Sequence, residues 1–347
     1  MPDRLPLRVA LLGFGLGGRA FHAPLVATTP GLELAAVVTR DPERRAQAAQ
    51  DHPDATLLDA AEDVWARADE LDLVVVTTPN RSHVPLATAA LEHGLPVVVD
   101  KPLAATAAEA RGLADAARER GLALSPFHNR RWDGDALTLR ALVDEGRLGD
   151  VWRLESRFER WRPTPKEGWR ESADPADGGG QLLDLGPHLV DQALWLLGPA
   201  PLAHAEVRVR RAGVEADDDA FVALAHASGA ISQLWMGATA ARSGPRFRVL
   251  GSEAGYVKDG LDVQEAQLKA GTWPGAAGYG AEPEAAWGTL GADDDVAPVA
   301  TRTGDYGAFY AQMAAAVRGE GPVPVEPADA VRVLELLDEA RALSGLA

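Results

Sequence analysis

Short apolar runs alternate with amphipathic segments along the first third of the chain. Consecutive apolar positions, such as the three valines at 74–76, predict strands buried on both faces, as in a parallel sheet covered by helices. Asp41-Pro42 and Thr106-Ala-Ala-Glu109 are typical helix starts. Strands are expected at 7–12, 34–39, 73–77, 96–99 and 122–125, and helices at 18–28, 42–50, 83–93 and 107–120. This alternation predicts a doubly wound α/β domain, the Rossmann fold.

The pattern changes after Phe127, where successive strands follow one another without helices between them. Tight turns such as Ser228-Gly229 indicate antiparallel pairs. Strands are expected at 151–158, 205–211, 220–226, 230–237, 246–250 and 254–258, helices at 136–145, 182–197, 305–317 and 327–343, and loops at 159–180 and 271–300. The second part is therefore expected to be an α+β domain with a large open, mostly antiparallel sheet.

The length and composition suit two globular domains. A chain of 347 residues with 46% hydrophobic residues can build two cores. We expect a dinucleotide-binding domain at 1–126 and a substrate and oligomerisation domain at 127–347, whose last helices are candidates to pack back on the first.

The charge and the absence of cysteine exclude several classes of function. A net charge of −17 repels nucleic acid and anionic lipid, so neither is an expected partner. Without cysteine there are no disulfides, thiolate nucleophiles or cysteine-bound metals. The apolar run at 5–12 leads into glycines rather than into a cleavage site, and no run reaches the ~20 apolar residues of a membrane span. A cytoplasmic protein is expected.

The glycines after the first strand form the pattern G-x-G-x-x-G. The run Gly13-Phe14-Gly15-Leu16-Gly17-Gly18 stands between a predicted strand and a predicted helix, the context in which this pattern binds dinucleotides. Gly13 allows the tight turn, Gly15 lets the backbone approach a pyrophosphate, and Gly18 allows the helix to pack closely on the strand. The helix N-terminus then supplies N–H donors to the phosphates.

The end of the second strand favours NADP(H) over NAD(H). An NAD site has an acidic residue here to hold the ribose hydroxyls. This chain has Thr39 at that place, followed by Arg40 and by Arg44 one helical turn later, and arginine suits a 2′-phosphate. Asp41 competes for the acidic role, but as an N-cap its carboxylate is needed by the helix.

Lys101 follows an apolar strand in the sequence Val97-Val98-Val99-Asp100-Lys101-Pro102. This position lies at the carboxyl edge of a doubly wound sheet, where ligands bind. The chain has only four lysines against thirty arginines, which makes a solvated lysine with no role the weaker interpretation. Lys101 is a candidate to orient and polarise a substrate hydroxyl.

Asp184 and His188 are four residues apart in a predicted helix and therefore share one face. A histidine supported by a carboxylate is suited to general acid–base catalysis. On its own, however, such a pair is more typical of a capped helix start with a structural histidine. Pro187 must lie in the first helical turn or break the helix between the two.

These motifs together resemble the glucose–fructose oxidoreductase, inositol dehydrogenase and MocA family, over nearly the whole chain. The matching motifs are Gly13–Gly18, Thr77-Thr78-Pro79-Asn80-Arg-Ser-His83, Asp100-Lys101-Pro102 in place of the commoner E-K-P, and Asp184-Leu-Gly-Pro-His188. Gly18-Arg19-Ala20-Phe21-His22-Ala-Pro24 and Phe127-His128-Asn129-Arg130-Arg131-Trp132-Asp133 are similar to the branch with NADP-dependent scyllo-inositol dehydrogenases.

The resemblance implies a role for each matching residue. Lys101 would bridge substrate hydroxyl and cofactor, His188 would exchange the proton, and Asp184 would hold His188 or the substrate. The cofactor-binding residues would be the phosphate loop together with Thr39, Arg40, Arg44, Thr78, Pro79, Asn80, His83, Asp100 and Lys101. The substrate pocket would be shaped by Asn129, Arg131, Trp161 and Arg162.

The expected function is an NADP-dependent oxidoreductase that transfers a hydride between nicotinamide and a hydroxyl or carbonyl carbon of a polyol or sugar. No metal is expected, because nicotinamide chemistry needs only acid–base help. Two alternatives stay open: a reductase of another carbonyl (a keto-sugar, dihydrodiol or xenobiotic ketone), and a nonenzymatic NADP-sensing regulator. A homodimer or homotetramer built on the open sheet is expected.

Overall fold

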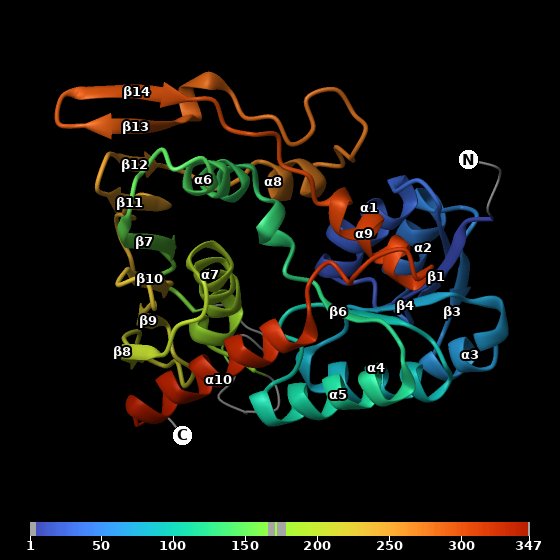
Figure 1. The fold of residues 1–347 in the computed structure, drawn as a ribbon. Coiled ribbons are helices and arrows are strands. Elements are labelled where there is room, and N and C mark those ends of the chain that lie inside the picture. Colours follow the sequence, from blue (N-terminus) through green and yellow to red (C-terminus); the bar gives the residue numbers. More distant parts are fainter. Residues whose placement is uncertain (1–4, 166–170, 172–177, 346–347) are drawn as a thin grey trace. The chain divides into compact units, whose positions relative to one another are not determined.

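The computed structural model describes residues 5–165, 171 and 178–345, and its chain divides into two compact units (Figure 1). The first unit comprises Met1–Asn129, Gln264–Tyr279 and Asp305–Val331. The second comprises Arg130–Val263, Gly280–Gly304 and Arg332–Ala347. Two late segments of the chain therefore belong to the first unit.

The first unit is built on six parallel strands in the order β3-β2-β1-β4-β5-β6. The strands are β1 (Leu7–Leu12), β2 (Leu32–Val38), β3 (Thr56–Leu58), β4 (Leu73–Val76), β5 (Val97–Val99) and β6 (Leu124–Pro126). Every residue of β4 and β5 is buried, as expected for strands covered on both faces. The predicted Rossmann fold is confirmed. The three-residue strand β3 was not predicted, and neither were the short helices at Ala61–Trp65 and Gln264–Lys269.

Helices cover both faces of this sheet. Figure 1 shows α1 and α9 on one side and α4 and α5, which contact each other, on the other. The helices of the first unit are α1 (Ala23–Thr28), α2 (Pro42–Asp51), α3 (Ala61–Trp65), α4 (His83–Glu92), α5 (Ala107–Arg120), α8 (Gln264–Lys269) and α9 (Gly307–Val317), and α10 (Pro327–Leu343) begins in it. Both predicted caps are present: Asp41 accepts from the Arg44 N–H at 2.9 Å, and Thr106 accepts from the Glu109 N–H at 3.3 Å.

The second unit contains an eight-stranded mixed sheet in the order β14-β13-β12-β11-β7-β10-β9-β8. Its strands are β7 (Val151–Glu159), β8 (Leu202–Arg208), β9 (Asp219–Ala225), β10 (Ile231–Gly237), β11 (Phe247–Gly251), β12 (Gly255–Lys258), β13 (Gly288–Ala292) and β14 (Asp295–Val299). All neighbours are antiparallel except β7 and β10, so the predicted mostly antiparallel sheet is confirmed. The parallel pair joins strands far apart in sequence, so no local turn could reveal it.

The segment 288–299 forms a hairpin, which corrects the expectation of a loop throughout 271–300. Its second strand is the edge of the sheet and is almost wholly exposed, so it lacks the alternation of a half-buried strand. Pro298 is tolerated at such an edge. Asp293 and Asp294 form its turn, where Asp293 has a positive φ of 49°, and Asp295 begins the second strand. The expected loop at 159–180 lies partly outside the described residues, which omit 166–170 and 172–177.

The helix α7 (Gln181–Leu197) packs on β7, β9 and β10 and contacts α6 (Gly134–Asp144). Pro187 lies within α7, and the helix continues through it, so neither position expected for this proline is correct. Fourteen of its residues are buried. Their packing stabilises the helix although Pro187 has no backbone N–H to donate. Asp184 and His188 consequently lie one turn apart on a single helix.

Among the described residues, no helix is long and apolar enough to cross a membrane.

The N-terminus of α7 is held by Asp217. Its carboxylate accepts from the Leu182 N–H at 2.7 Å, and its Oδ1 lies 2.0 Å from where a Cβ on Gly180 would stand, which explains the glycine. Burial raises the pKa of Asp217 to about 6, although the hydrogen bond from Leu182 and the charge of Arg341 oppose this rise. The charged form of Asp217 is therefore disfavoured in the folded protein.

We predict that Asp217→Asn flattens the dependence of unfolding free energy on pH. A carboxyl whose pKa is higher folded than unfolded contributes stability that is complete below its unfolded pKa, near 3.8, and is lost as pH rises through about 6. The loss should be roughly 3 kcal/mol between these limits and should be absent from the variant, as measured by denaturant unfolding. Asp294→Asn, at an exposed turn, controls for net charge. Equal pH slopes in wild type and Asp217→Asn would contradict the account.

Candidate active-site residues

The glycine loop between β1 and α1 is packed too tightly for side chains at its first and last glycines. Gly13 has a φ of 102°, and a Cβ there would stand 2.8 Å from the carbonyl oxygen of Thr77. A Cβ on Gly18 would stand 2.2 Å from the carbonyl oxygen of Gly13. The chain therefore turns sharply at the end of β1, and the following helix starts directly against that turn.

Gly15 is different, because a Cβ there would meet nothing within 4 Å. The protein itself does not require glycine at this position, so the space suits a ligand that approaches the backbone. The side chain of Phe14 is buried and anchors the loop, while Leu16 is exposed. The next turn, Gly18–His22, is π-helical, with the Ala23 N–H donating to the Gly18 carbonyl. Such a loop fits a dinucleotide pyrophosphate.

The end of β2 carries Thr39, Arg40 and two further arginines. Thr39 is buried, and Arg40 Nε donates to the carbonyl of Asp59 at 2.9 Å. The exposed Arg44 lies in the first turn of α2. The neighbouring Arg45 donates to the Thr39 carbonyl at 3.0 Å and to the Asp59 carboxylate at 2.6 Å. Arg45, which the sequence did not single out, therefore fixes this strand end.

Two loops that follow β4 and β5 are joined by His83. Its Nε2 lies 2.8 Å from the carbonyl oxygen of Thr78, and its Nδ1 lies 2.9 Å from that of Pro102. Burial lowers the pKa of His83, while the charge of Asp100 and the two carbonyl contacts oppose this shift. Only a ring that carries both protons donates to both carbonyls, and a neutral ring donates to one of them. Ser82 donates to the Pro79 carbonyl at 2.7 Å, and Asn80 is buried next to it in the chain. These residues hold the loops in place.

Asp100 lies where several of these segments meet in the first unit. Its Oδ1 accepts from the backbone N–H of Lys101 at 2.8 Å, and its Oδ2 lies 3.4 Å from the hydroxyl of Thr77 and 3.7 Å from Nε2 of His22. Burial raises the pKa of Asp100, but contact with His22 and the charges of Lys101 and His83 outweigh burial and lower it to about 2. Asp100 is therefore a carboxylate throughout the neutral range. Lys101 is partly buried beside it.

His22 and Tyr310 are buried residues of the first unit that the sequence did not single out as site residues. Tyr310, on α9, places its hydroxyl 2.5 Å from Nδ1 of His22. Burial and the nearby charge of Asp100 raise the pKa of Tyr310 well above its usual range, so the phenol stays protonated. The only signal in the sequence was the Phe21-His22-Ala-Pro24 motif, which gave a resemblance but no role.

In the second unit, α7 places Asp184 and His188 among buried residues. Both side chains are 6% exposed, and the ring of His188 lies 6.1 Å from that of Phe158 on β7. Further along α7, Asp191 forms a two-pronged ion pair with Arg131, at 2.6 and 2.9 Å. Arg131 thus ties the segment before α6 to α7.

The other expected substrate residues occupy separate places. Asn129 is buried at the end of the first segment of the first unit, while Trp161 and Arg162 follow β7 in the second unit. The side chain of Trp161 is 57% exposed, and its backbone pairs with that of Thr239. The N–H of Arg162 donates to the carbonyl of Ala238 at 2.8 Å.

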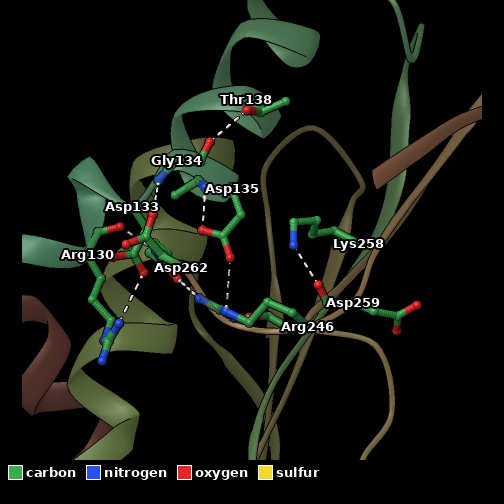
Figure 2. A network of polar contacts seen from close by, with 12 residues as sticks. Arg130, Asp133, Gly134, Asp135, Thr138, Arg246, Lys258, Asp259 and Asp262 are labelled. Carbon is green, nitrogen blue, oxygen red and sulfur yellow. Dashed lines mark hydrogen bonds and ion pairs between the residues drawn. The ribbon is translucent and has the colours of Figure 1, made fainter. Parts of the chain in front are cut away.

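A buried polar network supports this part of the second unit (Figure 2). Arg246 donates to Ser156 and to Gln192 of α7, each at 2.5 Å, and its Nε lies 3.7 Å from Asp135 of α6. Figure 2 shows the carboxylate of Asp135 directed toward Arg246. The guanidinium of Arg246 also lies 4.5 Å from the ring centre of Phe158, which neighbours His188. One arginine thereby fixes α6, α7 and β7.

The comparisons with known proteins match these two units. Residues 7–128 match the model of an oxidoreductase family with an NAD-binding Rossmann fold, and residues 136–257 match the GFO/IDH/MocA C-terminal domain. The chain is 39% identical over 338 residues to the oxidoreductase YdgJ of Escherichia coli, covering 96% of this chain and 94% of that protein. The chain belongs to the Gfo/Idh/MocA oxidoreductase family.

Other relatives agree with this assignment. The scyllo-inositol 2-dehydrogenase (NADP(+)) IolW of Bacillus subtilis is 32% identical over 338 residues, covering 96% of this chain and 92% of that protein. The solved structure of the oxidoreductase yvaA from Bacillus subtilis has a TM-score of 0.92 and 31% identity, over 99% of this chain and 98% of that one. The chain is thus an NAD(P)-dependent enzyme that acts on CH–OH groups.

We predict opposite outcomes for two glycine substitutions in the phosphate loop. Gly18→Ala places a methyl group against the Gly13 carbonyl and should lower the unfolding free energy by roughly 1–3 kcal/mol, as overpacking does. Gly15→Ala should leave stability within about 0.5 kcal/mol of wild type but weaken dinucleotide binding, because its methyl group occupies the ligand's space. Thermal unfolding and fluorescence titration with NADPH measure both. Unchanged dinucleotide affinity in Gly15→Ala would exclude Gly15 from the binding surface.

Proposed function

We propose that this protein is an NADP(H)-dependent dehydrogenase that transfers a hydride between nicotinamide and the CH–OH carbon of a polyol or sugar. The observation that carries the proposal is the edge formed by the carboxyl ends of β1, β2, β4 and β5. Gly13 follows β1, Thr39 follows β2, Thr77 follows β4, and Asp100 with Lys101 follows β5. In parallel sheets this edge binds the ligand. The phosphate loop, the ribose-binding strand end and the candidate catalytic lysine therefore share one edge of one sheet.

NADP(H) preference is supported by the absence of an acid at Thr39 and by Arg40 and Arg44 beside it. Arg44 is exposed, and a guanidinium is suited to a 2′-phosphate. The relative IolW carries NADP(+) in its name, which supports the same preference.

The proposed chemistry assigns a different task to each candidate residue. The nicotinamide, when bound, supplies or accepts the hydride. Lys101 orients the substrate hydroxyl and stabilises the charge that develops on its oxygen. His188 takes or returns the hydroxyl proton, and Asp184 orients His188 or the substrate. Phe14, Gly15, Leu16, Thr78, Pro79, Asn80 and His83 belong to the proposed cofactor site, and Asn129, Arg131, Trp161 and Arg162 to the proposed substrate site.

An inositol-like polyol is the first candidate substrate, because the relative IolW is named for scyllo-inositol. Reduction of another carbonyl is the alternative within enzymes. A cytoplasmic location, a homodimer or homotetramer, and a division of labour between residues 1–126 and 127–347 belong to the same proposal. Purified protein should be followed at the nicotinamide absorbance with NADP⁺ and a panel of inositols and sugars, and with NADPH and a panel of carbonyls. Dinucleotide binding without turnover on either panel would favour a regulator.

We predict that Thr39→Asp moves preference from NADP(H) toward NAD(H). The added carboxylate repels a 2′-phosphate and accepts from a ribose hydroxyl. Dissociation constants for NADPH and NADH, measured by fluorescence titration, should change in opposite directions. Arg44→Ala should weaken NADPH binding alone, while Arg120→Ala, an exposed arginine at the end of α5, should change neither. A wild-type protein that binds NADH as tightly as NADPH would contradict the proposed preference.

We predict that Lys101→Ala and His188→Ala each lower turnover by about 10²–10⁴-fold, the range for positioned electrostatic and proton-transfer groups. If both act on one hydroxyl, the double variant should be little worse than either single variant. Lys269→Ala and His204→Ala replace exposed counterparts and should retain full turnover. A purely structural His188 would instead give lower thermal stability with normal turnover per folded molecule, which removes His188 from the mechanism.

A further inference from the structure

One glycine of the phosphate loop is not explained by the dinucleotide pattern. Gly17 occupies an unrestricted position of G-x-G-x-x-G, yet a Cβ there would stand 2.6 Å from the Thr77 hydroxyl and 2.9 Å from Oδ2 of Asp100. The loop is therefore shaped around the Asp100 carboxylate, in addition to its cofactor. A carboxylate in this place also repels an anionic pyrophosphate, so its charge needs compensation.

His22 is placed to supply that compensation. Its Nε2 is buried, has no hydrogen-bond partner among the described residues, and lies 3.7 Å from Asp100 Oδ2. An uncompensated polar atom in such a place costs free energy, whereas an aliphatic side chain would fill the same space beside Phe127. The Asp100 carboxylate offsets this cost only if Nε2 carries a hydrogen that faces it.

The hydrogen-bond partner of His22 leaves its Nε2 as the proton-bearing atom. Tyr310 lies at Nδ1, and its phenol can donate to a neutral ring or accept from a protonated one. In both cases Nε2 carries the hydrogen that faces Asp100. The remaining ring form, with a bare Nε2, would set a lone pair against the carboxylate and is disfavoured.

We infer that His22 is a positioning residue, whose Nε2–H, held in place by Tyr310, fixes the Asp100 carboxylate between the phosphate loop and Lys101. This inference rests on the proposed function, because Lys101 matters only as a catalytic group. The titratable groups that act on Asp100 are His22, Lys101 and His83, and Asp100 in turn acts on Tyr310. Removing the imidazole leaves the carboxylate to turn toward the ammonium of Lys101 and toward the phosphate loop.

The scarcity of lysine allows a test that does not depend on substrate. The chain has only four lysines, so amine labelling followed by mass spectrometry reads each one separately. An uncompensated carboxylate pairs more closely with the Lys101 ammonium, and this pairing protects the amine from the reagent. In His22→Leu, Lys101 should therefore be labelled more slowly relative to Lys269, by on the order of tenfold, a factor typical of electrostatic contacts near 4 Å at a protein surface. The dissociation constant for NADPH should rise by a similar factor.

Two further variants separate positioning from packing. His22→Gln restores an N–H donor near the position of Nε2 and should recover most of both losses, which a purely structural role does not predict. Tyr310→Phe keeps the ring and removes the hydroxyl, so it should give a smaller loss in the same direction. Tyr306→Phe, at an equally buried phenol before α9, is the matched control and should behave as wild type. If His22→Leu does not fold, His22→Gln and Tyr310→Phe carry the test.

The inference and the proposed function fail in different ways. A wild-type protein that does not bind NADPH contradicts the proposed function, while Lys101 labelling still reports on His22. A wild-type protein that binds and uses NADPH, with Lys101 labelling and NADPH affinity per folded molecule unchanged in His22→Leu and in Tyr310→Phe, overturns the inference. Equal losses in His22→Gln and His22→Leu overturn it as well.

Discussion

The Asp100 carboxylate is the interaction on which the arrangement of the first unit depends. It accepts from the backbone of Lys101, faces Thr77 and His22, and occupies the space that leaves only hydrogen at Gly17. A single partly buried charge thereby links the carboxyl ends of β4 and β5 to the phosphate loop. Because a charge of this kind is costly to bury without partners, the surrounding segments must keep their positions for the carboxylate to remain compensated.

The second unit is likewise organised around a charged side chain, in this case the buried cation of Arg246. Arg246 is buried beside the rings of Phe158 and Phe247. It donates to Ser156 and Gln192 and forms a longer ion pair with Asp135, and these three partners come from three different elements. The pair Arg131–Asp191 adds a second anchor on α7. Removing one partner of such a network leaves another charge unpaired, so the network penalises any shift of the helix that carries His188. In the first unit the Asp100 carboxylate holds the backbone of Lys101, and in the second unit buried ionic contacts hold the helix that carries His188.

Local patterns predicted the parts of the fold that local physics determines. The consecutive valines of β4 and β5, the caps at Asp41 and Thr106, and the glycine loop each depend on a few neighbouring residues, and all were found as expected. Pairing over long distances was not readable: the parallel pair of β7 and β10 and the exposed edge strand β14 leave no local signature.

The same division applies to the candidate site. The sequence singled out Lys101, His188 and Asp184 by motif, and the structure gives their surroundings without testing their roles. The sequence motifs assigned no role to His22 or Tyr310, because residues 288 positions apart in the chain become partners only through folding. The sequence singled out Arg44, whereas Arg45 holds the strand end, since a helix turns neighbouring arginines in different directions. The site contacts that depend on tertiary packing therefore could not be predicted from the sequence.

Direct hydride transfer is the central claim of this account, and isotope transfer measures it most directly. The protein would be incubated with NADP⁺ and polyols or sugars that carry deuterium on their CH–OH carbons, and the dinucleotide would be analysed by mass spectrometry. We expect NADPH that carries one deuterium from an inositol-like polyol. In Lys101→Ala, deuterium transfer should fall to a small residual level. The proposed reaction would be contradicted by a protein that binds NADP⁺ tightly, transfers no deuterium from any compound of the panel and does not oxidise NADPH with any carbonyl tested.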